Sequence, residues 1–510
     1  MSVAIIYSRA QDGINAPLVT VEVHLSRGLP SFTIVGLPET TVKESKERVR
    51  SAILNNQFEF PLSRITINLA PADLPKEGGR FDLPIALGIL IASGQLPEKG
   101  IAGHEVIGEL SLTGELRPIT GVLPVSMAMK QSKRSLILPK ANADEAALVE
   151  NTICKPAEHL LDVCAHISGS SLLESHKSNP GNSKINYKQD LDDIYGHEHA
   201  KRALEIAAAG GHNLLMVGPP GSGKTMLAER MPTIMPPMTE EQALESAAIA
   251  SISRHGFSAE NWKQRIIRSP HHSASAVALV GGGSNPKPGE ISLAHNGILF
   301  LDELPEFDRK VLEVLREPLE SGRIIISRAA NQVEYPANFQ FIAAMNPCPC
   351  GYLGDKSGRC RCTEEQVHRY QHKISGPLMD RIDMVIEVNS IPDAIINQAK
   401  DENAESSATI RQRVINAFNM QLQRSGLVNS ELKTDNIEQH CYLTNADKVL
   451  LQTATTKLGL SGRAIHRVMK VARTIADLNN SDLIMTQHLS EAISYRQKIN
   501  EQQRLIPSEL

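Results

Sequence analysis

The first third of the chain contains short runs in which every second residue is apolar. Residues 18–23 and 64–69 alternate in this way, and helix-like apolar spacings lie between such runs. Alternation with a period of two predicts half-buried β-strands, because successive side chains of a strand point to opposite faces. Residues 1–170 are therefore predicted to form an α+β domain.

The pattern changes in the second part of the chain. Nearly continuous apolar runs at 213–217, 298–301 and 339–344 alternate with helix-like segments. Such runs are typical of parallel strands that are covered by helices on both faces. We predict an α/β core at 191–390 and a mostly helical domain at 391–510.

A stretch rich in Ser, Asn, Gly and Lys separates the first two regions. Residues 168–193 show no apolar periodicity, and we interpret 171–190 as a linker. The length of 510 residues agrees with this division, since a domain takes about 150 residues.

Composition narrows the classes of function. Lys and Arg total 53 against 57 Asp and Glu, which gives a net charge of −4, and only 4% of the residues are aromatic. These values argue against a uniformly basic nucleic-acid binder and against an extended base-stacking platform. They leave open a nucleic-acid motor whose basic residues are concentrated locally.

Nothing in the sequence predicts a membrane protein or a secreted one. No apolar run reaches the roughly 18–20 residues that a membrane span needs, and the first residues lack the pattern of a secretory signal. Seven cysteines without such a signal favour free thiols over a disulfide framework. We therefore expect a cytoplasmic protein.

The strongest motif follows the apolar run at 213–217. It has the pattern GxxxxGK[ST] between a predicted strand and a predicted helix. Glycines allow backbone N–H groups to surround phosphate oxygens, the lysine reaches the β- and γ-phosphates, and the threonine hydroxyl binds Mg²⁺. The predicted ATP-binding residues are Gly218, Pro219, Pro220, Gly221, Ser222, Gly223, Lys224 and Thr225.

A second motif completes this predicted site. The apolar run at 297–301 ends in Asp302 and Glu303. A carboxylate at the carboxyl end of a strand can hold Mg²⁺, and the next one can polarise the attacking water. We predict that Asp302 is the second magnesium ligand and that Glu303 is the catalytic base.

Further residues give the core a specific resemblance to AAA+ ATPases. Asn346 follows the third apolar run and resembles sensor 1, which orients the water. Arg381, within Asp-Arg-Ile-Asp, resembles the arginine finger of the magnesium-chelatase and replicative-helicase branch. Such a finger acts on the γ-phosphate of a neighbouring subunit and implies a ring, usually a hexamer. Arg463 resembles sensor 2, with Arg467 as its rival, and an ordinary solvated or ion-paired arginine is the alternative for each.

Two segments of the sequence could contact DNA. Residues 323–335 predict two short strands around a polar turn and resemble the pore hairpin of AAA+ motors, so that Arg328 at the tip could grip a phosphate backbone. A solvated hairpin arginine is the alternative. A predicted helix at 457–476 carries several basic residues on one face, which we interpret mainly as a solvated face.

His271 and His272 are adjacent and suggest a metal site at first sight. We disfavour that hypothesis, because neighbouring side chains of a strand point to opposite faces.

Four of the cysteines form two close pairs. Four thiolates in this spacing could bind a structural Zn²⁺, with redox chemistry or no ligand as alternatives. These residues, within an insertion at 348–362, are Cys348, Cys350, Cys360 and Cys362. Cys154, Cys164 and Cys441 are predicted to be packing residues.

The amino-terminal region resembles the proteolytic domain of Lon. The resemblance rests on Leu-Pro-Lys-Glu-Gly-Gly at 74–79 and on residues 108–119. Lon uses a serine nucleophile and a lysine base, but Arg80 and Leu123 stand at those two positions. We therefore expect a Lon-like fold without protease activity.

The whole chain resembles the ComM/YifB group of magnesium-chelatase-like proteins. The resemblance implies a multidomain α/β protein: a Lon-protease-like α+β domain, an AAA+ P-loop parallel sheet with helices on both faces, and an α-helical lid. It also implies a homo-hexameric motor that uses ATP and Mg²⁺. Its function would be helicase or branch-migration activity on single-stranded and branched DNA during natural transformation, together with recombination proteins.

Two alternatives remain beside this expectation. The protein could be a magnesium-chelatase-like subunit or a protein-remodelling ATPase without DNA activity. Against the first, the sequence lacks the Asp-x-Ser-x-Ser motif that chelatase partners usually carry.

Overall fold

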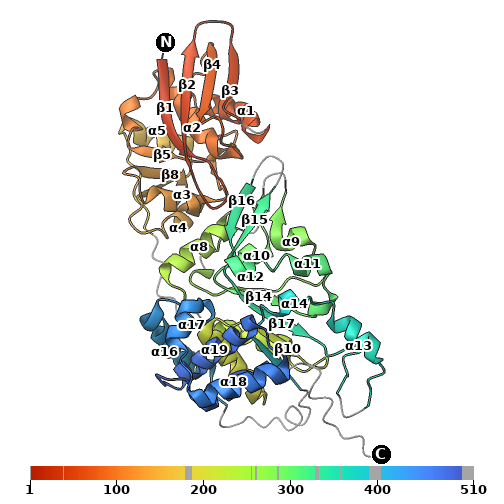
Figure 1. Cartoon of the computed structure of the whole chain (residues 1–510). Helices are drawn as coiled ribbons and strands as arrows, with labels where there is room; N and C mark the ends of the chain where they lie inside the picture. Colours follow the sequence, from red (N-terminus) through yellow and green to blue (C-terminus); the bar gives the residue numbers. More distant parts are fainter. Residues whose placement is uncertain are drawn as a thin grey trace, which may run out of the picture.

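The computed structural model describes residues 2–37, 40–177, 187–253, 256–258, 261–283, 286–327, 332–354, 358–389 and 404–496. The chain forms three regions in an elongated arrangement. A mixed-sheet region lies at one end, a parallel-sheet core in the middle and a helical region at the other end (Figure 1).

The amino-terminal region is built on a mixed sheet of seven strands in the order β3-β4-β2-β1-β5-β8-β9. Strand β2 runs antiparallel to both β1 and β4, and the other pairs are parallel. Side chains along β2 and β4 alternate between buried and partly exposed, which confirms the predicted period of two. The strands are β1 (Ser2–Arg9), β2 (Leu18–Ser26), β3 (Ser31–Val35), β4 (Arg64–Ala70), β5 (His104–Val106), β8 (Ser135–Pro139) and β9 (Cys154–Ala157), beside a small ribbon of β6 (Glu109–Leu110) and β7 (Leu116–Arg117).

The helices of this region include one that is buried along its whole length, α2 (Asp82–Ala92). It is the core helix of the domain, and among the described residues no helix is long and apolar enough to cross a membrane. The other helices are α1 (Thr40–Asn55), α3 (Val122–Met129), α4 (Ala143–Ala146) and α5 (Leu160–Ser168).

The middle region contains a five-stranded sheet in the order β11-β14-β17-β10-β18, and all its strand pairs are parallel. Leu214 and Met216 of β10 face one hydrophobic core, whereas Leu215 and Val217 face another. Two cores explain why β10 and β14 are apolar at every position. The strands are β10 (Leu214–Val217), β11 (Ile267–Arg268), β14 (Ile298–Leu301), β17 (Gln340–Met345) and β18 (Met384–Glu387).

Helices and two ribbons surround this sheet. The ribbons are β12 (Gly281–Gly282) with β13 (Lys287–Pro288), and β15 (Arg323–Ser327) with β16 (Gln332–Pro336). The helices are α6 (Glu198–Gly210), α7 (Lys224–Ile234), α8 (Glu240–Ser251), α9 (Ala276–Val280), α10 (Glu290–Leu293), α11 (Arg309–Glu313), α12 (Pro318–Ser321), α13 (Glu364–Gln371) and α14 (Gly376–Met379).

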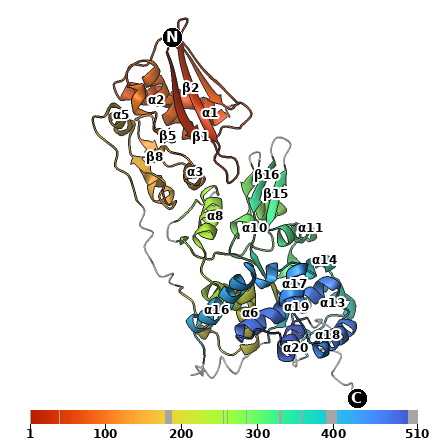
Figure 2. The same cartoon turned by 60° about the vertical axis from the view of Figure 1, so that its left-hand side comes forward.

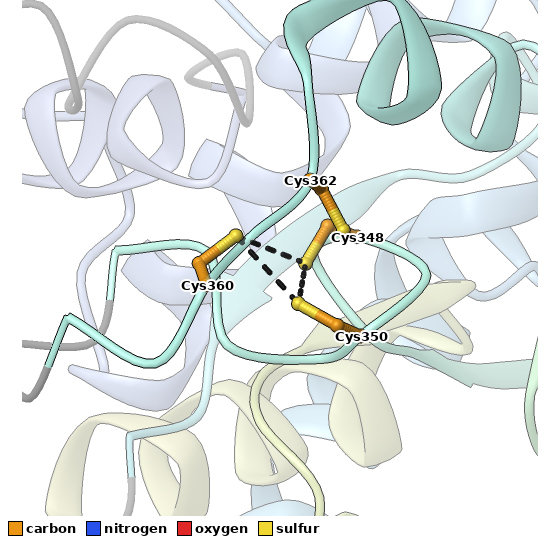
Figure 3. Close-up of side chains that lie close together, drawn as sticks. All are labelled: Cys348, Cys350, Cys360 and Cys362. Carbon is orange, nitrogen blue, oxygen red and sulfur yellow. Dashed lines mark hydrogen bonds between the residues drawn. The ribbon is translucent and has the colours of Figure 1, made fainter.

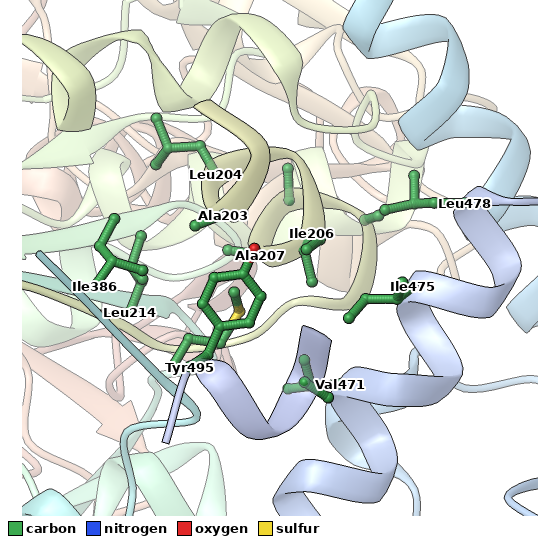
Figure 4. Packing of buried hydrophobic residues seen from close by; sticks show 14 of the residues in the cluster. Ala203, Leu204, Ile206, Ala207, Leu214, Ile386, Val471, Ile475, Leu478 and Tyr495 are labelled. Atoms are coloured by element: carbon green, nitrogen blue, oxygen red, sulfur yellow. The ribbon is translucent and has the colours of Figure 1, made fainter. Parts of the chain in front are cut away.

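The carboxyl-terminal region is helical, as predicted. Its helix α19 (Gly462–Leu478) directs Val471, Ile475 and Leu478 towards Ile206 of α6, and this packing joins the region to the core (Figure 4). The other helices are α16 (Ser407–Ser425), α17 (Thr434–His440), α18 (Asn445–Leu458) and α20 (Thr486–Ser494).

The prediction of a single helix at 457–476 is wrong. Helix α18 ends before Gly459, which takes a left-handed conformation with a φ of +62°. Helix α19 then begins after Ser461, whose side chain accepts a hydrogen bond from the backbone N–H of Ala464. A left-handed glycine and a serine N-cap are common signals for the end and the start of a helix.

The amino-terminal region packs directly against the core. Leu123 of α3 shares a hydrophobic cluster with Ala247 and Ala248 of α8 (Figure 2). Ile14, in the turn between β1 and β2, packs into the core that contains Tyr335 of β16. The ribbon β15–β16 therefore lies between the two sheet-containing regions.

The first part of the predicted linker lies on the amino-terminal region. The N–H of His176 donates a hydrogen bond to the carbonyl of Cys154 in β9, at 2.9 Å. Leu173 packs against the core of that region. These contacts extend the amino-terminal region several residues into the predicted linker.

Candidate nucleotide-binding site

The turn between β10 and α7 has the backbone that the glycine-rich motif predicts. Gly221 and Gly223 have φ values of +74° and +83°, which favour glycine. A Cβ on Gly218 would lie 2.1 Å from the carbonyl oxygen of Val388, so this position requires glycine for lack of space. A Cβ on Gly221 would meet nothing within 4 Å, so this side of the turn is open. Helix α7 starts immediately after Gly223, and its amino terminus favours an anion there.

Lys224 is held inside this turn. Its Nζ donates hydrogen bonds to the carbonyls of Gly218 at 2.8 Å and Pro219 at 2.9 Å. It also lies 3.4 Å from Oδ1 of Asn346. Burial lowers the pKa of Lys224, while the carboxylates of Asp302 and Glu303 oppose that shift. The side chains of Lys224 and of Asn346, the predicted sensor 1 residue, therefore lie next to each other.

Thr225 and Asp302, the two predicted magnesium ligands, also meet. The hydroxyl of Thr225 donates to Oδ2 of Asp302 at 2.7 Å. Parallel strands bring their carboxyl ends to one edge of the sheet, which is why residues 77 positions apart come together. Two neighbouring oxygen donors suit a hard cation such as Mg²⁺, so the residues present fit the predicted metal.

Glu303 has an unusual backbone and a partner that we did not predict. Its φ of +53° lies in the left-handed region, which few residues other than glycine adopt. Its N–H donates to Oδ1 of Asp302 at 2.9 Å. Oε2 of its side chain lies 3.2 Å from Nδ1 of His272.

The prediction that His271 and His272 lie on a strand, with side chains on opposite faces, is wrong. Strand β11 ends at Arg268, so His271 and His272 lie in the following turn and not on a strand. The centroids of their rings are 4.1 Å apart. The pattern of a short strand followed by Ser-Pro could have indicated this turn, because proline disfavours a continuing strand.

The four cysteines of the insertion gather around one point (Figure 3). Sγ of Cys348 lies 3.3 Å from Cys350 and 3.8 Å from Cys360, and all four sulfur atoms lie within 4.8 Å of one another. Zinc–sulfur bonds of about 2.3 Å place the sulfur atoms of a tetrahedral site about 3.8 Å apart. The cluster therefore fits Zn²⁺, and its shortest separation is longer than a disulfide bond of about 2.05 Å.

This cysteine cluster is next to the nucleotide site. Cys348 follows Asn346 by two residues, and a Cβ on Gly351 would lie 2.5 Å from Cδ of Pro220. The loop that carries the cysteines therefore touches the glycine-rich turn.

The remaining cysteines lie in apolar cores. Burial raises the pKa values of Cys154 and Cys441 to about 11 and that of Cys164 to about 12. Thiols that ionise so reluctantly are poor nucleophiles and metal ligands, in agreement with the predicted packing role.

Arg381, the predicted arginine finger, is engaged within its own chain. Its guanidinium pairs with Glu320 and donates to the carbonyls of Arg316 at 3.1 Å and Pro377 at 2.7 Å. Only 7% of the residue is exposed. Reaching a neighbouring subunit would require these contacts to change.

The structure separates the two candidates for sensor 2. Arg467 pairs with Asp383 and also contacts the carbonyl of Arg381. Burial alone would raise the pKa of Asp383, but Arg467 and His212 hold it below its ordinary value. Arg463 is exposed in the first turn of α19. Arg467 is therefore engaged within its own chain, and Arg463 is the more exposed of the two candidates.

The interpretation of the rest of the basic helix as a solvated face is wrong in part. Lys470 donates to the carbonyl of Ser430 at 2.9 Å, and Arg473 is 1% exposed beside Asp477.

The hairpin predicted to contact DNA is present. Strands β15 and β16 pair antiparallel, from Arg323 opposite Pro336 to Ser327 opposite Gln332. Arg328, the predicted phosphate contact, lies outside the described residues.

The two positions that the resemblance to Lon assigns to catalysis have structural roles here. Arg80 is 6% exposed and donates from Nη2 to Oε1 of Gln11 and to the carbonyl of Thr120, both at 2.9 Å. Burial lowers the pKa of Arg80 to about 10. Leu123 is buried against α8. Neither position offers a nucleophile or a base.

The comparisons with known proteins decide the family. Over 510 residues the chain is 52% identical to "Competence protein ComM" of Haemophilus influenzae (strain ATCC 51907 / DSM 11121 / KW20 / Rd), covering 99% of each chain. It is also 52% identical over 497 residues to YifB of Escherichia coli (strain K12), covering 97% of each. The chain belongs to the ComM/YifB family. This ComM/YifB protein is also 22% identical over 323 residues to "DNA replication licensing factor Mcm6" of Drosophila melanogaster, covering 59% of this chain and 36% of that one.

Three stretches of this ComM/YifB protein match families of the magnesium chelatase subunit ChlI. Residues 190–396 match "Magnesium chelatase, subunit ChlI", residues 21–142 match "Subunit ChlI of Mg-chelatase", and residues 404–496 match "Magnesium chelatase, subunit ChlI C-terminal". The first match covers the parallel-sheet core. This ComM/YifB protein is therefore a magnesium-chelatase-like AAA+ ATPase with a mixed-sheet amino-terminal region and a helical carboxyl-terminal one.

Proposed function

We propose that this protein is an ATP-driven DNA motor that promotes branch migration when incoming DNA is integrated by homologous recombination in natural transformation. The observation that carries the proposal is the meeting of Lys224, Thr225, Asp302 and Asn346 at one edge of the parallel sheet. The name of the Haemophilus influenzae relative, a competence protein, supports the biological process. The partial similarity to a DNA replication licensing factor supports a DNA substrate.

In this proposal each residue of the edge has one task. Lys224 leaves the carbonyls that hold it and neutralises the β- and γ-phosphates, while the N–H groups of the turn surround them. Thr225 and Asp302 hold Mg²⁺, which offsets phosphate charge when bound. Glu303 accepts a proton from the attacking water, and Asn346 orients that water. The water oxygen bonds to the γ-phosphorus as the bond to the ADP oxygen breaks.

Hydrolysis in this proposal requires a ring of identical subunits, most simply a hexamer. Arg381 contributes to the site of its neighbour, and Arg463 acts as sensor 2. Since Glu320 and two carbonyls hold Arg381 within one chain, subunit contact must redirect its guanidinium. Arg381→Ala should then lose assembly-dependent hydrolysis and still bind nucleotide. Unchanged hydrolysis by that variant would show that the finger is another residue.

DNA contact in this proposal is local. A ring needs basic side chains only around its pore, so a chain of net charge −4 can still grip phosphates. The hairpin β15–β16 is the proposed contact, and Arg328, outside the described residues, is the proposed phosphate-binding side chain. We propose single-stranded and branched DNA as the substrates and recombination proteins as the partners. Because these would be encountered in the cytoplasm, we propose that the protein acts there.

We assign a structural Zn²⁺ to Cys348, Cys350, Cys360 and Cys362, since their four sulfur atoms lie within 4.8 Å of one another. We also propose that the amino-terminal region has a Lon-like fold without protease activity, because Arg80 and Leu123 replace the catalytic pair.

A second candidate rests on the matches to ChlI, which cover all three regions. In that case the protein would drive metal insertion together with a chelatase partner.

ATP hydrolysis with and without single-stranded and forked DNA separates the candidates. The DNA motor predicts a several-fold increase in kcat that Glu303→Gln abolishes. Rates that are equal with and without DNA would favour the second candidate.

A further inference from the structure

A cavity of about 450 Å³ lies in the amino-terminal region, outside the nucleotide-binding site. It is formed by the end of β1, by β5 and by the segment that joins α3 to β8. Its volume falls within the range of sites that bind small molecules. The charged and polar residues that line it are Arg9, Glu105, Gln131, Ser132, Lys133 and Arg134.

A buried carboxylate holds the two arginines of this cavity in place. The side chain of Glu105 is fully buried; its Oε2 accepts from Nε of Arg9 at 2.6 Å, and its Oε1 accepts from Nη1 of Arg134 at 3.4 Å. The hydroxyl of Ser132 also donates to Oε1, at 3.1 Å. The guanidinium of Arg134 lies over the ring of Tyr7, 3.7 Å from its centroid. Because these contacts orient both guanidinium groups, a ligand would meet them already in place.

The cavity carries more positive charge than its carboxylate can balance. Three cations line it, and the one carboxylate among the lining residues is shared between the two arginines. Lys133 is exposed and forms no ion pair within the described part of the chain. In that same part of the chain, Arg134 has an acceptor only for Nη1 of its side chain, so its Nε and Nη2 can donate to an external group. Cations that gather in a concave space attract an anion.

We propose that this cavity binds a phosphate group, and that the phosphate belongs to the backbone of the DNA on which the protein acts. The assignment to DNA rests on the proposed function; a free phosphorylated molecule is the other source of the same chemistry. Guanidinium groups present pairs of N–H donors that match two phosphate oxygens. Among the described residues that line the cavity none is aromatic, so no ring is offered on which a base could stack. Contact with the backbone alone is independent of sequence, as a motor requires.

The cavity lies at the base of the turn that reaches the hairpin β15–β16. Nη1 of Arg9 donates to the carbonyl of Ala16 at 2.8 Å, across the turn between β1 and β2. A Cβ on Gly13, in the same turn, would lie 2.7 Å from Cγ1 of Val333 in β16. The hairpin is the other proposed DNA contact, so one turn joins the two. DNA bound at both would be attached to the amino-terminal region and to the ATPase core at once.

The test compares two double variants of the full-length protein that lose the same charge from the same region. Lys133→Gln with Arg134→Gln removes two cations from the cavity. Lys140→Gln with Arg117→Gln is the matched control, because both residues are exposed and lie outside the lining of the cavity.

The first measurement is the binding of fluorescent forked DNA at several salt concentrations, with a non-hydrolysable ATP analogue filling the nucleotide site. We expect the cavity variant to bind about tenfold more weakly, with a dependence of log K on log salt that is flatter by about 1–2. The control variant should stay within about twofold of the unmodified protein. The second measurement is calorimetric binding of inorganic pyrophosphate, again with the nucleotide site filled. We expect the cavity variant to lose it and the control variant to keep it.

Each result decides a separate part of the proposal. Weaker DNA binding by the cavity variant alone supports it, whereas loss of pyrophosphate binding with unchanged DNA affinity would overturn the assignment to DNA and indicate a free phosphorylated ligand. Equal behaviour of the two double variants in both measurements would overturn the site. Should the cavity variant unfold on thermal analysis, Lys133→Gln alone decides: DNA binding about threefold weaker supports the site, and unchanged binding overturns it. If the unmodified protein does not bind forked DNA, the proposed motor function fails, while pyrophosphate binding still tests the phosphate site.

Discussion

Two turns of this molecule share a glycine with positive φ near a basic residue, and their chemistry differs. Gly78 precedes the short 3₁₀-helix Gly79–Phe81, which contains Arg80, and Gly223 precedes α7, which starts at Lys224. Arg80 is enclosed by fixed partners from its own domain. Lys224 instead adjoins groups that are exposed to solvent, such as the carboxylate of Glu303. A turn supports catalysis when its polar groups face space that a substrate can enter, and otherwise it serves as structure.

Removing each basic residue in turn tests the difference between the two turns. Lys224→Ala should abolish ATP binding and reduce hydrolysis by about 10³-fold or more, since a charge that stabilises a transferring phosphoryl group contributes several kcal/mol. Arg80→Ala is the matched control and should leave kcat within about twofold. Equal losses in the two variants would contradict the distinction between the two turns.

The second test concerns the structure that supports the nucleotide turn. Replacing Cys350 and Cys360 by serine should remove zinc and lower kcat about tenfold, because the cysteine loop touches Pro220 and continues from Asn346. Metal analysis and steady-state ATPase assays measure both effects, with Cys441→Ala as the control that keeps the metal. Zinc well below one equivalent per chain in the unmodified protein would rule out the site.

The third test measures what Arg80 contributes as a structural residue. Arg80→Ala should lower the free energy of unfolding of the amino-terminal region by about 1–3 kcal/mol, because the buried guanidinium and its two partly buried hydrogen bonds to Gln11 and Thr120 are lost. Denaturant unfolding followed in that region gives the value. Arg80→Ser should not be labelled by a serine-hydrolase probe, since Leu123 leaves no base nearby. A stability equal to that of the unmodified protein would show that the Arg80 contacts are dispensable.

The smallest expected effect is a dependence of stability on pH. Burial lowers the pKa of His212 to about 4, which Asp383 opposes, so the folded protein binds fewer protons than the unfolded chain between about pH 4 and 6.5. Stability should be complete above about pH 6.5 and should fall as the pH drops, by about 1–1.5 kcal/mol at pH 5.5. Unfolding measured at pH 7.5 and 5.5 tests this, and His212→Gln should reduce the difference. The same difference in that variant would exclude His212 as the cause.

Short-range patterns predicted the scaffold of the site. Alternation predicted β2 and β4, and continuous apolar runs predicted β10, β14 and β17, with the glycine-rich turn after β10 and Asp302 after β14. These features depend on neighbours in the sequence and on the rule that ligands bind at the carboxyl ends of parallel strands.

Long-range partners could not be predicted in the same way. Arg467 pairs with Asp383, 84 residues away, so its position on a helical face did not reveal that it is engaged. His272 was assigned to a strand, and its contact with Glu303 comes from the packing of the turn after β11. Ion pairs between distant segments depend on the assembled fold, and apolar periodicity carries no information about them.

We propose that ATP hydrolysis at Glu303 moves this protein along DNA. Branch migration of a synthetic mobile junction, with ATP and the full-length protein, tests it most directly. We predict that the unmodified protein converts the junction to products and that Glu303→Gln binds ATP but converts none. An unmodified protein that hydrolyses ATP and leaves the junction unchanged would contradict the claim.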